Sequence, residues 1–92
     1  MADVIVKLKV MPTSPELDLS KLQAEIEQKI KKFGAKHMHS VTKEPVAFGL
    51  NALIFTFLID EAKSNLDLLE NDIKSLSEIQ SVEIIDVRRA IG

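Results

Sequence analysis

Cysteine is absent from this chain of 92 residues, and glycine occurs only three times. The absence of cysteine excludes disulfide bonds, thiolate nucleophiles, and zinc or iron–sulfur sites with cysteine ligands. The glycines are Gly34, Gly49 and Gly92, too far apart to build a glycine-rich phosphate loop. No spacing of serine, histidine and acidic residues indicates a catalytic triad. We therefore expect that the chain is not an enzyme and binds no cofactor.

Long apolar runs and a positive excess are also missing. No run reaches the ~18 apolar residues of a transmembrane helix, and the start at Met1-Ala2-Asp3 lacks the basic residues of a secretory signal. Twelve Lys and Arg stand against 14 Asp and Glu, a net charge of −2, which is unlike a domain that wraps nucleic acid. Hydrophobic residues make up 46%, enough for one core. We expect a soluble, cytoplasmic protein with one domain, residues 1–92.

The first half of the chain changes its hydrophobic period twice. Residues 3–11 alternate between apolar and polar side chains, which predicts a strand with one buried face. Residues 19–33 have apolar side chains at every third or fourth position, as in an amphipathic helix, with Asp18 as N-cap and Gly34 just past the end. Residues 36–44 are more polar and predict an edge strand.

The second half contains the most apolar segment. Residues 50–59 predict a buried central strand. Residues 60–63 read as a loop, and Ser64 with Asp67 resembles a capping box before a helical stripe that reaches Leu76. Residues 81–89 predict a last strand, in which the apolar phase shifts at Ile84-Ile85 and indicates a β-bulge.

The order β-α-β-β-α-β predicts an α+β fold, the ferredoxin-like sandwich, with a four-stranded antiparallel sheet and two helices on one face. Right-handed crossovers give the strand order 4-1-3-2. The turn at residues 45–49 then lies at one end of the sheet, and Arg88-Arg89 lies at the other, on the order of 30 Å away. Three lysines, Lys31, Lys32 and Lys36, would join the arginines in a basic end.

Phe48-Gly49, in the predicted turn, is the most informative local feature. A phenylalanine beside a glycine that permits positive φ either projects outward as an anchor for a partner's pocket or folds back into the core.

Arg88-Arg89 has two interpretations as well. The pair either binds phosphates or carboxylates or ends a strand in solvent, and alternation directs the two side chains to opposite faces.

His37 and His39 stand two apart on a strand, a spacing compatible with two metal ligands or with an exposed pair. The neighbouring sequence supplies no third ligand, so we expect no metal site.

A fold of this kind serves several functions. One alternative is a regulatory module that binds a small ligand or self-associates through its open sheet face. Another is an RNA-binding domain, but the aromatic sheet signature of RNA-recognition domains is missing, and Phe55 and Phe57 fit the core better.

Three segments carry a more specific signal. Residues 3–12, residues 44–53 and residues 82–89 resemble translation elongation factor 1-beta of the archaeal type, with Glu-Pro-Val-Ala-Phe-Gly-Leu at 44–50 as the distinctive block. The resemblance covers nearly the whole chain and implies guanine-nucleotide exchange on the GTPase elongation factor 1-alpha, by disturbance of its Mg²⁺ and phosphate site. We expect a monomer when free, with neither nucleic acid nor membrane as a partner.

The resemblance also implies contact residues at both ends. The hairpin anchor is Phe48, supported by Gly49 and Leu50, and the tail contributes Arg88, Arg89 and Ile91. The tail departs from the family in one respect, because the lysine that eukaryotic members place just before the C-terminus has no counterpart in residues 86–92. Either an arginine or the bulk of the terminal segment then replaces its action.

Overall fold

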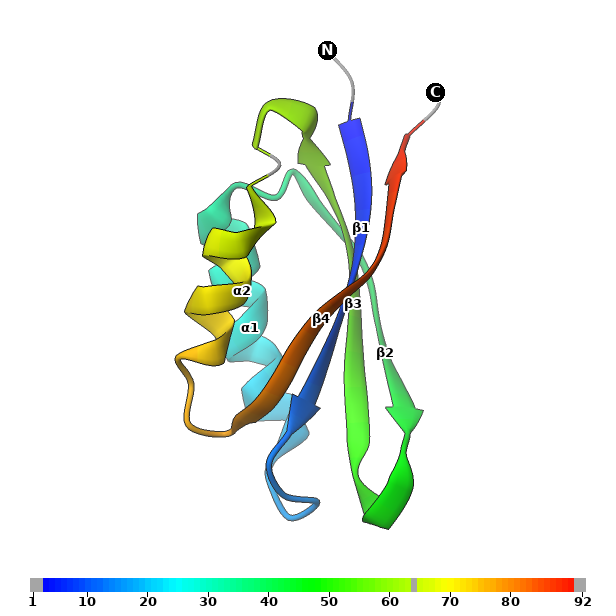
Figure 1. Cartoon of the computed structure of the whole chain (residues 1–92), viewed down its shortest axis with the longest axis vertical. Coiled ribbons are helices and arrows are strands. Elements are labelled where there is room, and N and C mark those ends of the chain that lie inside the picture. The colour runs from blue at the N-terminus through cyan, green and yellow to red at the C-terminus, as the bar shows by residue number, and fades with distance from the viewer. Residues whose placement is uncertain (1–2, 64, 91–92) are drawn as a thin grey trace.

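A computed structural model describes residues 3–63 and 65–90, and in it four strands form one antiparallel sheet in the order β2-β3-β1-β4. The strands are β1 (Asp3–Pro12), β2 (His37–Pro45), β3 (Asn51–Asp60) and β4 (Ile79–Arg89). Both helices, α1 (Leu19–Phe33) and α2 (Leu66–Lys74), cover the same face of the sheet (Figure 1). The predicted α+β ferredoxin-like fold and strand order are confirmed. Neither helix in the described part of the chain combines the length and apolar character needed to cross a membrane.

Local sequence explains the ends of α1. The Asp18 carboxylate accepts hydrogen bonds from the backbone N–H groups of Ser20 and Lys21, at 3.0 and 3.3 Å. Gly34 follows the helix with φ 121°, a backbone conformation that favours glycine. The second helix differs from expectation, because Asn65 occupies the N-cap position without a side-chain cap bond, and the predicted cap Ser64 lies outside the described residues. It also ends at Lys74, and residues 61–63, expected to be a loop, form a 3₁₀ turn.

The core lies between the sheet and the helices. Alternate residues of β1 and β3 face the helices and are buried, with Phe55 and Phe57 as the largest fully buried side chains. Apolar stripes on α1 and α2 close the other side of this core, including Ile26, Ile30 and Ile73. We call the sheet surface under the helices the helix face and the other surface the open face.

Each edge strand carries a bulge. On β4, Lys7 pairs with Asp86 and Leu8 pairs with Ile84, so Ile85 is the extra residue, as the shift of apolar phase predicted. On β2, Met38 and Ser40 pair with consecutive residues of β3, which leaves His39 unpaired. A bulge reverses the alternation of every residue beyond it. The side chains near the end of β4 therefore occupy the faces opposite to those that simple alternation from Val82 would give.

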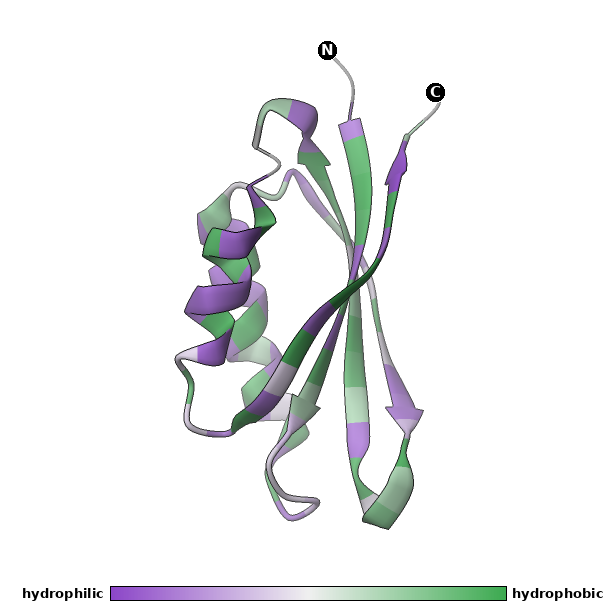
Figure 2. Ribbon diagram, viewed as in Figure 1, coloured by the Kyte–Doolittle hydropathy of each residue, from purple (hydrophilic) through white to green (hydrophobic). Residues whose placement is uncertain are grey.

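The molecule is elongated, 42 Å along its longest axis. One tip is the connection between β2 and β3, residues 46–50, which we call the hairpin end. The start of β1 and the last residues of β4 lie together at the opposite tip, the terminal end (Figure 1). The hairpin end is apolar, whereas the last residues of β4 are strongly hydrophilic (Figure 2). The predicted separation of the turn from Arg88-Arg89 is thus confirmed.

Candidate functional site at the two ends of the sheet

A tight turn closes the hairpin end. The Val46 N–H donates to the carbonyl oxygen of Leu50 at 2.8 Å, and the Leu50 N–H donates to the carbonyl oxygen of Ala47 at 3.3 Å. Phe48 and Gly49 occupy the two central positions with φ angles of 64° and 75°. Consecutive positive φ angles are typical of type I′ hairpin turns, in which asparagine, aspartate and glycine are preferred.

Phe48 projects from this turn into solvent. Its exposed fraction is 93%, so the alternative that it folds back into the core is wrong. Gly49 is exposed and Leu50 is half-buried. A Cβ atom built on Gly49 would lie 3.9 Å from the Cβ of Pro15, so the loop after β1 lies beside the turn.

The conformation of Phe48 has an energetic cost that its own burial does not offset. Phe48 is the only residue other than glycine with a positive φ in the described part of the chain. A side chain in this region costs roughly 1–2 kcal/mol relative to an ordinary backbone conformation. An exposed phenylalanine buries too little surface to compensate. A strained and exposed aromatic residue at the tip of a rigid hairpin is typical of a contact residue.

The terminal end carries both arginines of the candidate site. The Arg88 Nε atom lies 2.8 Å from Oδ2 of Asp86 on the same strand. The Arg89 Nη2 atom lies 2.6 Å from Oε1 of Glu61, in the turn that follows β3. Arg88 pairs with Ile5 on the open face and Arg89 with the buried Val4 on the helix face. The two arginines therefore point to opposite faces, as alternation predicted.

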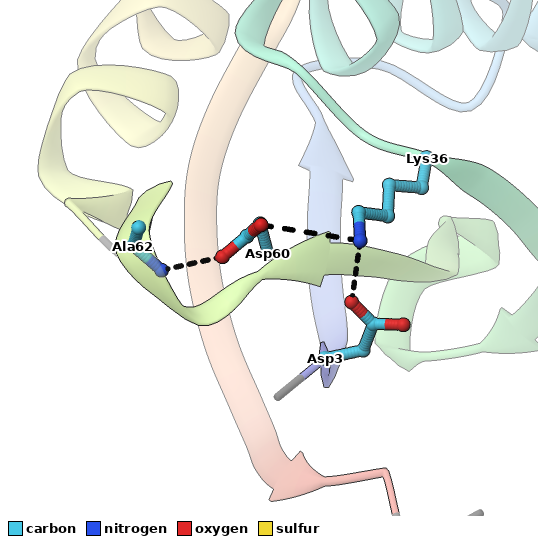
Figure 3. Close-up of polar contacts among 4 residues, drawn as sticks. All are labelled: Asp3, Lys36, Asp60 and Ala62. Atoms are coloured by element: carbon cyan, nitrogen blue, oxygen red, sulfur yellow. Dashed lines mark hydrogen bonds and ion pairs between the residues drawn. The ribbon is translucent and has the colours of Figure 1, made fainter. Parts of the chain in front are cut away.

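A third cation at this end is held by two carboxylates (Figure 3). The Lys36 Nζ atom lies 2.7 Å from Oδ1 of Asp3 and 3.9 Å from Oδ2 of Asp60. The other oxygen of Asp60 accepts a hydrogen bond from the Ala62 N–H at 2.9 Å. The hydrogen bond that Lys36 donates to Asp3 is the main reason that the pKa of Lys36 lies above its usual value, and the negative charges of Asp3 and Asp60 contribute further.

These contacts correct the expectation of a basic end. Lys36, Arg88 and Arg89 are all bound by acidic side chains, namely Asp3, Asp60, Glu61 and Asp86. The cations alone predict a basic end, but carboxylates surround them in the fold. Asp60-Glu61, at the end of the central strand, was an available signal, because it places two acids at the same end as the arginines. Lys31 and Lys32, also expected there, line a groove with Asp72 of α2.

The histidines lie on the open face. His37 and His39 have ring centroids 6.0 Å apart at 73°, an edge-to-face arrangement. His39, the bulge residue, lines a groove on the open face together with Lys7, Asp86 and Arg88. Within residues 3–63 and 65–90, no group of three or more His, Asp or Glu side chains is placed to hold a metal ion. The last candidate contact residue, Ile91, lies outside the described residues.

Comparison with known proteins identifies the family. The model of the EF-1 guanine nucleotide exchange domain matches residues 5–90. The chain belongs to this family. An elongation factor 1-beta from Methanosphaera stadtmanae is 43% identical over 89 residues, which cover 97% of this chain and 98% of that protein. An elongation factor 1-beta from Nanoarchaeum equitans is 40% identical over 83 residues, which cover 90% of this chain and all (100%) of that protein.

Solved structures of other families share the fold of this exchange domain. The ACT domain of GTP pyrophosphokinase from Chlorobium tepidum superposes with a TM-score of 0.62 and covers 90% of this chain, with 99% of its own chain matched. Its sequence identity is 13%, so this likeness concerns the fold alone.

Proposed function

We propose that this chain promotes the exchange of GDP for GTP on elongation factor 1-alpha during translation elongation. Its membership of the exchange-domain family and the match to relatives named elongation factor 1-beta over nearly their whole length support this function. Exchange makes and breaks no covalent bond, so the protein acts as a binding partner of a GTPase and not as an enzyme.

The exposure of Phe48 is the structural observation that best supports this proposal. A 93% exposed aromatic side chain at one tip of an elongated molecule is suited to anchor a partner's pocket. The turn that presents Phe48 is fixed by backbone hydrogen bonds, so the main chain of the turn loses little conformational entropy when the ring is bound. Gly49 and Leu50 support this anchor. Arg88 and Arg89 at the opposite tip contact the nucleotide domain of the GTPase, together with Ile91, which lies outside the described residues.

Exchange requires that binding of the factor and binding of GDP oppose one another. If the factor weakens GDP binding by a given ratio, GDP weakens the factor by the same ratio. The Mg²⁺ ion of the GTPase joins the β-phosphate to protein oxygens and is a large share of the charge at that site. Contacts from the terminal end disturb this coordination, while the Phe48 contact supplies binding free energy that does not depend on nucleotide.

Release of a fluorescent GDP from elongation factor 1-alpha, followed by stopped flow, tests the function. The chain should accelerate release in a saturable manner, and release that is unchanged at saturating amounts would refute the proposal. Phe48→Ala should raise the half-saturating concentration by about 5–150-fold, equivalent to ~1–3 kcal/mol. Leu68→Ala is the matched control, because Leu68 is an exposed apolar side chain on α2 and not part of the hairpin end.

A further inference from the structure

The arginines of the terminal end are already bound by carboxylates of their own chain. Asp86 contacts Arg88 on the open face, at 2.8 Å, and Glu61 contacts Arg89 on the helix face, at 2.6 Å. Both arginine side chains nevertheless remain 74% and 69% exposed. A guanidinium group has five N–H donors, and each of these contacts uses only part of that capacity. Each arginine is therefore accessible to an external anion, although an acidic side chain of the same chain already contacts it.

The two acidic side chains that contact the arginines show which kind of ligand each arginine binds. A guanidinium group pairs best with two oxygens of a carboxylate or a phosphate. Glu61 and Asp86 each offer such oxygens, and Lys7 lines the same groove as Arg88, so a second cation faces an anion bound on the open face. The two sites lie on opposite faces of β4, so one small anion does not occupy both.

The internal contacts are of the kind that a competing anion displaces easily. Ion pairs between exposed side chains contribute little net stability, because water solvates both partners and salt screens them. Glu61 is 44% exposed, and it precedes Ala62, whose N–H is fixed by Asp60. Displacement of the Glu61 side chain from Arg89 therefore requires no change of the fold.

We infer that Glu61 and Asp86 are internal competitors that occupy two anion-binding sites at the terminal end, and that a carboxylate or phosphate of the GTPase–nucleotide complex replaces them on binding. This inference rests on the proposed function. Internal acids also disfavour the binding of other anions, which is a simple form of selectivity. The arginines are exposed to a partner without giving the terminal end the positive field that would attract nucleic acid.

Removal of each competitor tests the inference. Glu61→Gln and Asp86→Asn each remove one negative charge and keep the shape of the side chain. Asp72→Asn is the matched control, because Asp72 forms the same kind of exposed ion pair, with Lys29 at 3.0 Å, on the surface of the helices. At low salt, Glu61→Gln and Asp86→Asn should bind GDP-bound GTPase about two- to fivefold more tightly than Asp72→Asn, and this advantage should shrink as salt rises.

Two outcomes would overturn the inference. If Glu61→Gln and Asp86→Asn bind no more tightly than Asp72→Asn, the carboxylates do not compete with the partner. If they bind more weakly, the carboxylates position the arginines instead. Failure of the wild-type chain to release GDP would refute the proposed function itself, which is a different result.

The same binding measurements distinguish the two possible ligands. Tighter binding of the variants to both nucleotide-free and GDP-bound GTPase identifies a partner carboxylate, whereas tighter binding to the GDP-bound form alone identifies a phosphate.

A titration without the GTPase tests the inference on this chain alone. Titration with inorganic phosphate, followed by the NMR signal of the Arg89 Nε–H group, should give a midpoint about two- to fivefold lower for Glu61→Gln than for wild type. An equal midpoint in the two proteins would contradict competition at Arg89.

Discussion

Arg88 and Arg89 are neighbours on β4, yet they bind carboxylates on opposite faces of the sheet. Arg88 contacts Asp86 on the open face, and Arg89 contacts Glu61 beside the helices. A surface of the GTPase that reaches both must wrap around the edge strand. Under the proposed function, the two arginines therefore make separate contacts with the partner.

Separate contacts predict additive losses. Arg88→Ala and Arg89→Ala should each raise the half-saturating concentration for GDP release by roughly 5–30-fold, or ~1–2 kcal/mol. In the double variant the free-energy losses should sum to within about 0.5 kcal/mol, because the side chains share no ligand. Stopped-flow release assays on the three variants give these values. A double variant no worse than either single one would show that both arginines bind a single group.

The pairing of β4 with β1 sets which face each arginine occupies, and the bulge maintains that pairing by taking up Ile85 as an extra residue. Deletion of Ile85 removes the unpaired residue and leaves the pairing of Arg88 with Ile5 intact. Deletion of Val87 instead shifts the last residues by one position, so that Arg88 pairs with Val6 and Arg89 with Ile5, and both change faces.

These deletions form a matched pair, because each shortens an exposed edge strand by one residue. The chain without Ile85 should keep most of its exchange activity, whereas the chain without Val87 should lose at least as much as an arginine-to-alanine variant. Activity assays, with circular dichroism to check folding, measure this. Equal activity of the two deletions would show that the faces of the arginines are unimportant.

Local and periodic features of the fold were predictable from the sequence. Asp18 and Gly34 act within one turn of helix, so their residue types alone identify them as caps. The strand order followed from the apolar content of β1 and β3 and from chain topology. The bulge at Ile85 was visible because it interrupts an apolar pattern, whereas the bulge at His39 was not, because β2 is mostly polar and has no apolar alternation to interrupt.

The charge distribution at the terminal end was less predictable. Lys36 contacts Asp3 and Asp60, which are separated from it by 33 and 24 positions in the chain, so only the register of three elements brings the group together. Composition and spacing do not contain that register. The positive φ of Phe48 was equally out of reach, since the sequence placed that conformation at Gly49, although the outward anchor was one of the two alternatives.

The contact between Lys36 and Asp3 predicts a dependence of stability on alkaline pH. The pKa of Lys36 is raised by its hydrogen bond with Asp3 above the usual value of 10.5, so the folded state holds this proton more tightly than the unfolded chain does. The contribution is therefore fully present below pH 10.5 and is lost as the pH rises through the folded-state pKa. The chain has no tyrosine or cysteine to add its own titration in this range.

Thermal unfolding from about pH 9 to about pH 12 measures this contribution. The melting temperature of wild type should fall more steeply than that of Lys36→Met, which lacks the titrating group. Lys43→Met, which removes a charge from an exposed position on β2, should follow wild type. Parallel curves for wild type and Lys36→Met would mean that the Lys36 contacts make no contribution to stability in solution.

The strained turn at the hairpin end predicts opposite effects on stability and exchange. Asparagine tolerates positive φ better than phenylalanine does, so Phe48→Asn should relieve part of the strain and stabilise the fold by about 0.5–1 kcal/mol. The substitution loses almost no buried surface, because the ring is exposed. The same variant should lose exchange activity as severely as Phe48→Ala, since both remove the aromatic anchor.

Phe48→Leu separates the two effects, because leucine keeps an apolar side chain but gains no tolerance of positive φ. It should match wild type in denaturant unfolding and retain more exchange activity than Phe48→Asn. If Phe48→Asn proved less stable than wild type, the ring would be packing against the protein in solution, and its proposed role as an anchor would be untenable. If Phe48→Asn were more stable and fully active, the strain would be real but would serve some purpose other than binding the GTPase. Higher stability together with lost exchange is therefore the single combination that ties the backbone conformation of this residue to recognition of the partner.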